Sequence, residues 1–540
     1  MPPGSTIDIH GYPLPTAFGP QWQRGMAMAG QGDMAAAAAC MQAIVDARPD
    51  CLPARLQQAH FLLGADRYRD ALAVALDLSD CTPANLEFAW HLVRLLRRFE
   101  LHEQVAAVVS RSGWAHSRDA RGLSMLAAEL GPIGLYAPMQ ALLERASALG
   151  PPDRDTHVLR GTMAFVAGDA AGASAALREA LAMGGEAPPH VRWMLTLQDD
   201  AAHAQTDMRA IEGELARVRP GSEDEAYLAF ALHNLRHAAG DVEGAWAALE
   251  RGCRVKRQAA RHDDARQQRL FQALAAAPLP QALPDEAPAP GPGPRPVFIV
   301  GMFRSGTSVV ERVLSGHPDV VDGGESYVMP AAMCAAADHL CNEVVDERMI
   351  ERIDAEGLRM AALRFRAHAR WKAGERAVFT EKLPSNFLLT GYILASMPEA
   401  RIVHMRRDPM DTCFSNLRTF FTGAAGYSYD QSSLARYYLG YRALMAHWRE
   451  RWPERILEVD YQAFVDDPDG QSRRLLAFCG LDFVPSVLDV GRSGGYSATA
   501  SIGSVRQGIL RNRGGAWRAY AAHLQPLREG LAPLLAADGD

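Results

Sequence analysis

Residues 297–314 read VFIVGMFRSGTSVVERVL, and this stretch decides the fold of the second half of the chain. Val297–Val300 is a short apolar run typical of a buried strand, Gly301–Ser308 is a glycine-containing loop, and Val309–Leu314 has a helical pattern. A loop between a strand and a helix presents backbone N–H groups and a helix N-terminus to a bound anion. The stretch therefore predicts a phosphate-binding loop.

Three more apolar runs follow the loop and are separated by helical patterns. They lie at residues 377–380, 401–405 and 456–459. Alternating strands and helices favour a parallel sheet with helices on both faces. The sequence thus predicts an α/β domain, whose functional residues would gather at the carboxyl ends of the strands.

The loop has the spacing of a Walker A motif but lacks its lysine. Thr307 occupies the lysine position, and the loop's cation is Arg304, three residues earlier. A nucleotide kinase or NTPase is therefore an alternative function, but such an enzyme would lack the lysine that contacts the β- and γ-phosphates.

The string RSGTS after an apolar strand resembles the 5′-phosphosulfate loop of sulfotransferases, which use 3′-phosphoadenosine-5′-phosphosulfate (PAPS) as donor. The resemblance covers most of residues 297–520 and points to the bacterial family that joins a repeat domain to a domain similar to tyrosylprotein sulfotransferases. It implies a sulfuryl transfer that needs no metal. It also implies that the loop binds PAPS through Arg304, Ser305, Gly306, Thr307 and Ser308.

A second motif implies the site of the donor's 3′-phosphate. The run at 401–405 leads into Arg406-Arg407-Asp408-Pro409, and a serine follows at Ser415. In the family, an arginine at the strand end and a serine eight residues later hold this phosphate, which assigns Arg407 and Ser415. Arg406 is the adjacent competitor for this role. The structural alternative is that Arg407 is a surface arginine that caps a helix.

The resemblance also implies the catalytic residues. Glu325 lies 21 residues after Arg304 and matches the general base of tyrosylprotein sulfotransferases. Lys382 matches a lysine that neutralises the bridging oxygen as the donor bond breaks. Small-molecule enzymes keep a histidine two residues after this lysine, where this chain has Pro384. A structural glutamate is the alternative for Glu325, and His317 is the next candidate base.

Near the end of the chain, residues 511–517 loosely resemble the terminal loop that closes over the donor. The resemblance implies donor contacts from Ser501, Arg511 and Arg513.

The first half of the chain repeats a helix–turn–helix pattern at a step of 34 residues. The turns lie at Gly32, Asp66, Glu100, Gly134 and Gly168, and a further one lies at Gly240. A small residue often follows five positions later, as at Ala37, Ala71, Ala173 and Ala245. Residues 20–260 resemble tetratricopeptide repeats, which implies an all-α solenoid with a concave groove.

This repeat pattern has exceptions. Glu100 replaces the turn glycine, Val105 and Met139 replace the small residue, and residues 195–225 are off-register. The groove could bind a peptide or another subunit, or the array could only support the second domain.

The predicted organisation is a repeat domain at 1–275, a proline-rich linker at 276–296 and a sulfotransferase domain at 297–540. The net charge of −7 and the lack of a basic run argue against a nucleic-acid partner. We find neither a signal peptide nor an apolar run long enough to span a membrane, so we expect a cytoplasmic protein. The acceptor stays open among peptide tyrosine, saccharide and small metabolite. A non-catalytic repeat scaffold is a further alternative.

Overall fold

The computed structural model describes residues 6–184, 188–198, 202–279, 293–423, 425–489 and 514–537. The chain divides into two compact units, each of which combines separate stretches of sequence. Unit 1 comprises residues 1–152, 283–289 and 326–374, and unit 2 comprises 153–282, 290–325 and 375–540. The predicted limits at 275 and 297 stay predictions.

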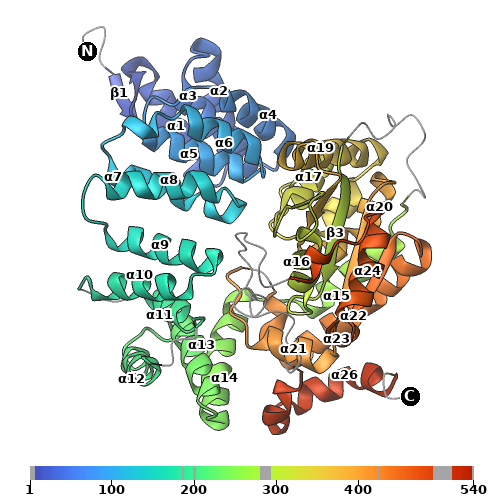
Figure 1. Ribbon diagram of the computed structural model, residues 1–540. Coiled ribbons are helices and arrows are strands. Elements are labelled where there is room, and N and C mark those ends of the chain that lie inside the picture. Colours follow the sequence, from blue (N-terminus) through green and yellow to red (C-terminus); the bar gives the residue numbers. More distant parts are fainter. Residues whose placement is uncertain are drawn as a thin grey trace. The chain divides into compact units, whose positions relative to one another are not determined.

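Unit 1 begins with a hairpin and a series of helices (Figure 1). The hairpin strands β1 (Thr6–Ile9) and β2 (Tyr12–Pro15) are antiparallel and were not predicted. The helices that follow are α1 (Gly19–Gly30), α2 (Met34–Ala47), α3 (Leu52–Gly64), α4 (Tyr68–Ser79), α5 (Leu86–Arg97), α6 (His102–Arg111), α7 (Ala120–Ala128) and α8 (Tyr136–Ser147).

The structure confirms the helix–turn–helix period and explains its turn residues. Every predicted turn residue has a left-handed backbone, with φ from 52° at Glu100 to 86° at Gly32. Glycine adopts this conformation without strain, whereas Asp66 and Glu100 adopt it at some cost. Aspartates after three of the glycines cap the next helix by accepting a backbone N–H: Asp33, Asp169 and Asp241. Assignment to the tetratricopeptide family stays a prediction.

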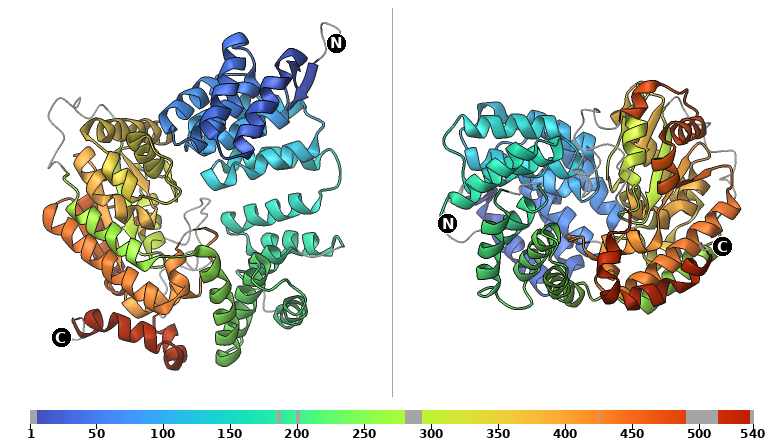
Figure 2. Two further views of the ribbon diagram at one scale, coloured as in Figure 1. Left: turned by 180° about the vertical axis from the view of Figure 1, so that it is seen from behind. Right: turned by 60° about the horizontal axis from the view of Figure 1, so that its bottom comes forward.

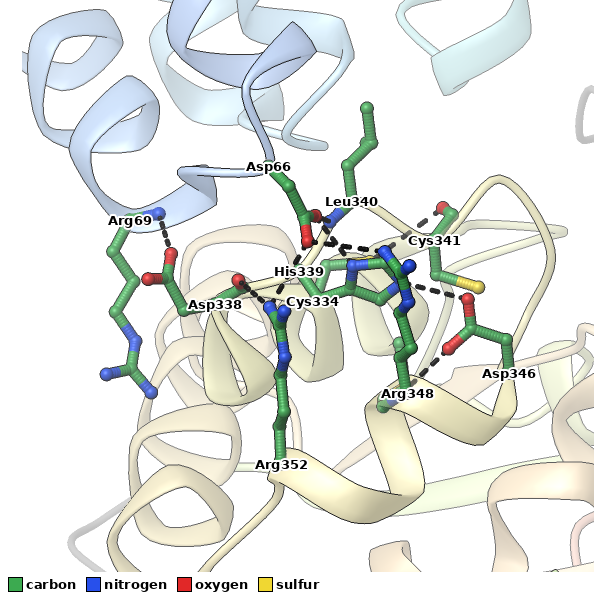
Figure 3. Close-up of polar contacts among 11 residues, drawn as sticks. Asp66, Arg69, Cys334, Asp338, His339, Leu340, Cys341, Asp346, Arg348 and Arg352 are labelled. Carbon is green, nitrogen blue, oxygen red and sulfur yellow. Dashed lines mark hydrogen bonds and ion pairs between the residues drawn. The ribbon is translucent and has the colours of Figure 1, made fainter. Parts of the chain in front are cut away.

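Unit 1 also contains helices from much later in the sequence: α17 (Val328–Ala337), α18 (Glu347–Arg352) and α19 (Ala355–Ala373). Figure 3 shows how the turn before α4 meets this later segment. His339 lies between two carboxylates, with Nδ1 2.6 Å from Asp66 Oδ1 and Nε2 2.8 Å from Asp346 Oδ2. The Leu340 N–H and the Arg352 guanidinium also donate to Asp66.

These contacts hold both carboxylates in their ionised form. Burial alone would raise the pKa of Asp66, but hydrogen bonds from the Leu340 N–H and from His339 lower it below its ordinary value. Burial would also raise the pKa of Asp346, but hydrogen bonds from His339 and from the Met349 N–H lower it below its ordinary value. Their contribution to stability is therefore present above the ordinary aspartate pKa of 3.8 and is lost as the pH falls through the lowered values.

We expect His339→Ala to destabilise unit 1 by about 1–3 kcal/mol at pH 7, because two carboxylates lose their shared partner. Thermal unfolding measures this change, and the difference from the native chain should shrink in acid. His116→Ala, at an exposed histidine of the same unit, is the control. An unchanged melting temperature for His339→Ala would contradict the prediction.

Unit 2 contributes the later repeat helices and an α/β region. The repeat helices are α9 (Arg154–Ala167), α10 (Ala170–Ala182), α11 (Pro189–Leu195), α12 (Ala204–Leu215), α13 (Glu223–Ala238), α14 (Val242–Ala260) and α15 (Asp264–Ala276). Figure 2 shows α13 and α14 from behind, in green, lying against each other. The off-register stretch at 195–225 begins at the last residue of α11 and contains α12.

The predicted parallel sheet is confirmed, and the described residues contribute five strands to it. They are β3 (Arg295–Gly301), β4 (Val320–Asp322), β5 (Val378–Glu381), β6 (Arg401–Arg406) and β7 (Ile456–Asp460). Their order is β4-β5-β3-β6-β7, and every neighbouring pair is parallel. β4 was not predicted. The strand that leads into the glycine loop, β3, is therefore the central one.

Side chains of β3 alternate between two buried faces. Val297 and Ile299 pack in a core with α16 (Thr307–Ser315), α23 (Tyr461–Asp466) and α24 (Pro468–Cys479). On the neighbouring strand β6, His404 bonds to Tyr441 of α22 (Gln431–Arg451). Burial on both faces is typical of parallel sheets and fixes the strands that carry the loop.

Among the described residues, unit 2 also contains the α-helices α20 (Thr390–Ser396), α21 (Pro409–Leu417) and α26 (Gln525–Ala537). Within the described ranges, none of the helices is long and apolar enough to cross a membrane. The linker predicted at 276–296 lies largely outside the described residues.

Candidate functional site

The glycine loop follows β3 directly and ends at the N-terminus of α16, as predicted. Arg304 adopts a left-handed backbone with φ of 67°, which is strained for a residue with a side chain. Gly306 has φ of 101°, and a Cβ there would lie 2.5 Å from the Tyr461 ring. The loop is therefore shaped by a glycine that nothing larger can replace and by a strained arginine.

The loop has the chemistry that a phosphate or sulfate group requires. Gly306 precedes α16 and supplies no side-chain cap for the first N–H groups of that helix. The Ser305 hydroxyl is buried and has no hydrogen-bond partner among the described residues. Uncapped N–H groups and an unsatisfied hydroxyl favour a bound anion. The loop residues thus fit the 5′ end of a nucleotide donor.

Arg304 and Ser415, assigned to the two ends of the donor, lie together. Arg304 Nε donates to Ser415 Oγ over 3.2 Å. Ser415 lies on α21, which begins at Pro409 after β6. The helix is anchored by the Asp408 cap and by Asn416, whose amide donates to the Phe303 carbonyl in the loop.

The contacts of Arg406 and Arg407 distinguish these two candidates for the 3′-phosphate site. Arg406 is bound to Glu458 on the neighbouring strand, with Nη1 2.6 Å from Oε1. Arg407 instead lies over the Tyr461 ring at 4.9 Å, the same ring that Gly306 approaches. Tyr461 therefore links Arg407 to the loop, and this favours Arg407 over Arg406 for a contact with the nucleotide.

Glu325 and Lys382 form an ion pair at the carboxyl end of β5. Lys382 Nζ donates to Glu325 Oε1. The chain before Glu325 runs against β5, because the Gly323 N–H bonds to the Thr380 carbonyl and the Lys382 N–H bonds to the Gly324 carbonyl. A Cβ at Gly323 would lie 2.5 Å from Thr380 O, so glycine permits this close approach.

A second acidic residue, Glu311 of α16, lies against the same lysine and was not predicted. Its Oε2 is 3.5 Å from Lys382 Nζ, and both side chains are buried. Burial opposes the charge of Lys382, but the carboxylates of Glu311 and Glu325 outweigh it and raise the pKa of the lysine. Lys382 is therefore a cation at neutral pH.

His317, the next candidate base, and His404 of β6 both have structural partners. His317 Nε2 lies 3.1 Å from the Asp482 carbonyl, and its Nδ1 accepts the Asp319 N–H. His404 is fully buried, and Tyr441 Oη lies 2.5 Å from its Nε2. Burial lowers the pKa of His404 despite the nearby Glu458. His317 is thus less suited to act as a base than its place in the sequence indicated.

The terminal loop is described only in part. Ser501, Arg511 and Arg513 lie outside the described residues. The chain is described again from Gly514, and the Gly515 N–H donates to Asp411 Oδ1 over 2.7 Å. Asp411 lies 3.9 Å from Arg407 Nη2, so the end of this segment reaches the second motif.

One group of potential metal ligands occurs among the described residues, and it lies in unit 1. His10, Glu87 and His91 have ligand atoms within 4.8 Å of one another. His10 Nδ1 lies 3.1 Å from Glu87 Oε1. The expectation that the reaction needs no metal stays a prediction.

Together, the fold and the site define an α/β domain with a glycine-containing loop at the carboxyl edge of a parallel sheet. Residues 296–485 match the model of the sulfotransferase family, so the chain carries a sulfotransferase family domain.

The chain is similar to several known proteins. An uncharacterised protein of Aquifex aeolicus is 29% identical over 61% of this chain and 44% of its own length. The protein-tyrosine sulfotransferase of Drosophila melanogaster is 28% identical over 36% of this chain and 39% of its own. The chain thus spans less than half the length of either relative. The sulfotransferase domain of the Synechococcus olefin synthase is 18% identical, with a TM-score of 0.28, over 45% of this chain and 97% of that domain.

Proposed function

We propose that this protein transfers a sulfuryl group from PAPS to an acceptor hydroxyl. The observation that carries the proposal is the Glu325–Lys382 ion pair at the carboxyl end of β5, beside the strand that leads into the glycine loop. A base and a buried cation next to an anion-binding loop are what such a transfer needs.

Each residue has a definite task in this proposal. PAPS, when bound, supplies the sulfuryl group and the 3′,5′-ADP leaving group. Glu325 accepts the proton of the acceptor hydroxyl as the oxygen–sulfur bond forms. Lys382 and Arg304 face the negative charge that develops on the bridging oxygen as the old bond breaks. The loop N–H groups and Arg407 hold the two phosphate ends of the nucleotide.

Two measurements with the full chain test the proposal. Calorimetry with 3′,5′-ADP should show binding at sub-millimolar concentration, and its 3′-dephosphorylated analogue should bind more weakly. Labelled PAPS should then transfer its sulfuryl group to members of an acceptor panel. Lack of 3′,5′-ADP binding would end the proposal. Mg²⁺-dependent ATP turnover would favour the kinase alternative, and binding without transfer would favour the scaffold.

We expect Arg407→Ala to weaken the binding of 3′,5′-ADP by about 10-fold or more, since a charge-assisted bond to phosphate contributes roughly 1.5–3 kcal/mol. The expected effect on kcat at saturating donor is smaller. Arg406→Ala is the control, because Arg406 is bound to Glu458. Equal donor affinity in Arg407→Ala and the native chain would show that the 3′-phosphate lies elsewhere.

The acceptor could belong to any of three chemical classes: peptide tyrosines, saccharides and small metabolites. The names of the relatives and the Glu325 base support a macromolecular acceptor such as a peptide tyrosine, which the repeat helices could help to bind. Saccharides and small metabolites belong in the same labelled-donor screen. We also propose a cytoplasmic location, which cell fractionation tests.

A further inference from the structure

Three carboxyl groups surround the single ammonium of Lys382. Glu325 is its hydrogen-bonded partner, Glu311 Oε2 is 3.5 Å away, and Asp322 adds a third negative charge at the end of β4. Glu311 and Lys382 are 1% and 0% exposed, so water contributes almost nothing to their solvation. Glu325 and Asp322 remain accessible to solvent, but an ionised carboxylate at Glu311 would lose its hydration beside a lysine that is already paired with Glu325, and this arrangement is costly.

The hydrogen bonding favours Glu311 as the acid that carries a proton. Glu311 Oε1 is buried and, within the described part of the chain, has no hydrogen-bond partner in its ionised form. Asp322 is the neighbouring group that a protonated Glu311 can bond. Asp322 itself accepts the Gly324 N–H over 2.7 Å, which fixes its position beside Glu311. A proton on Glu311 would satisfy its buried oxygen and remove one of the three charges.

The electrostatics point the same way. Burial raises the pKa of Glu311 well above its ordinary value of 4.5, and the negative charge of Asp322 raises it further, while Lys382 only partly offsets them. The titratable groups that face Glu311 are Asp322 from β4, Glu325 from the following turn and Lys382 from the end of β5.

We propose that Glu311 is a positioning residue: it is protonated at neutral pH, donates that proton to Asp322 in a hydrogen bond, and thereby leaves Glu325 as the ionised partner of Lys382. Its role in turnover rests on the proposed sulfuryl transfer, whereas its protonation does not. Because Glu311 lies on the helix that follows the glycine loop, it also connects the lysine to the donor site. Glu325 then has the charge that a proton acceptor requires.

Infrared difference spectroscopy of the full chain at pH 7 tests the protonation. The spectrum of the native chain minus that of Glu311→Gln should contain the C=O band of a neutral carboxyl group. The matched difference for Glu325→Gln should contain carboxylate bands instead. Carboxylate bands in the Glu311 difference would overturn the proposal, whether or not the protein transfers sulfuryl groups.

Kinetics test the positioning. Glu311→Ala should lower kcat by on the order of 10²-fold with little change in the KM for PAPS, because Lys382 loses its alignment. Glu311→Gln should restore most of this loss, because its amide can donate to Asp322 and accept from Lys382 as a neutral carboxyl does. A Glu311→Gln enzyme as slow as Glu311→Ala would also overturn the proposal. If the native chain transfers nothing, the proposed function fails and the infrared result still decides the protonation.

Discussion

Glu325→Gln is expected to lower turnover by roughly 10²–10⁴-fold, the range that a general base contributes. The amide keeps the shape of the side chain and can still contact Lys382, but it cannot take the proton of an acceptor hydroxyl. Binding of 3′,5′-ADP should persist, because the loop and Arg407 are untouched. Calorimetry and a labelled-donor assay on the same preparation separate the two effects.

Asp319→Asn provides the matched control for this variant. Asp319 is an exposed acid six residues earlier on the same segment, so the substitution removes the same charge away from the ion pair. It should leave turnover near the native rate. Near-native turnover in Glu325→Gln itself would remove Glu325 as the base, and the partners of His317 would make that histidine a poor substitute.

Arg304→Ala is expected to slow transfer by roughly 10²–10³-fold, since it removes a preorganised charge from the reacting group. Folding should be retained, because the left-handed backbone at this position is no harder for alanine than for arginine. Steady-state kinetics with circular dichroism as a folding check measure both outcomes.

Arg304→Lys distinguishes charge from geometry. Lysine keeps the charge but lacks the planar fork of the guanidinium, so its rate should lie between those of the native chain and the alanine variant. Full activity in Arg304→Ala would exclude this side chain from the transfer and leave Lys382 as the main cation.

The sequence was a good guide to the α/β framework because local signals define it. Apolar runs and the glycine loop placed β3, β5, β6 and β7 and the start of α16 within two residues. β4 has three residues, too few for a periodic signal, and the N-terminal hairpin was also missed. The 34-residue step was recognisable although Asp66 and Glu100 replace glycine, because the left-handed backbone of each turn repeats.

The sequence was less informative about charges inside the site. Glu311 follows two valines on a helix, where a charged residue is ordinarily expected to face solvent. Its burial depends on strands that are distant in sequence, and no local pattern contains that information. The choice between Arg406 and Arg407 likewise depended on Glu458 and Tyr461, which lie more than 50 residues further on.

The later helices of unit 1 limit which segments of this protein can be exchanged for those of another protein. Arg364 of α19 is half-buried and donates to the Phe99 carbonyl, and His339 bonds to Asp66 in the turn before α4. A fragment that starts at the proline-rich stretch would expose these groups to solvent with their counterparts missing. Gene fusions that exchange the N-terminal half for another repeat protein should therefore yield insoluble chains, unless residues 326–374 are redesigned to match the new partner.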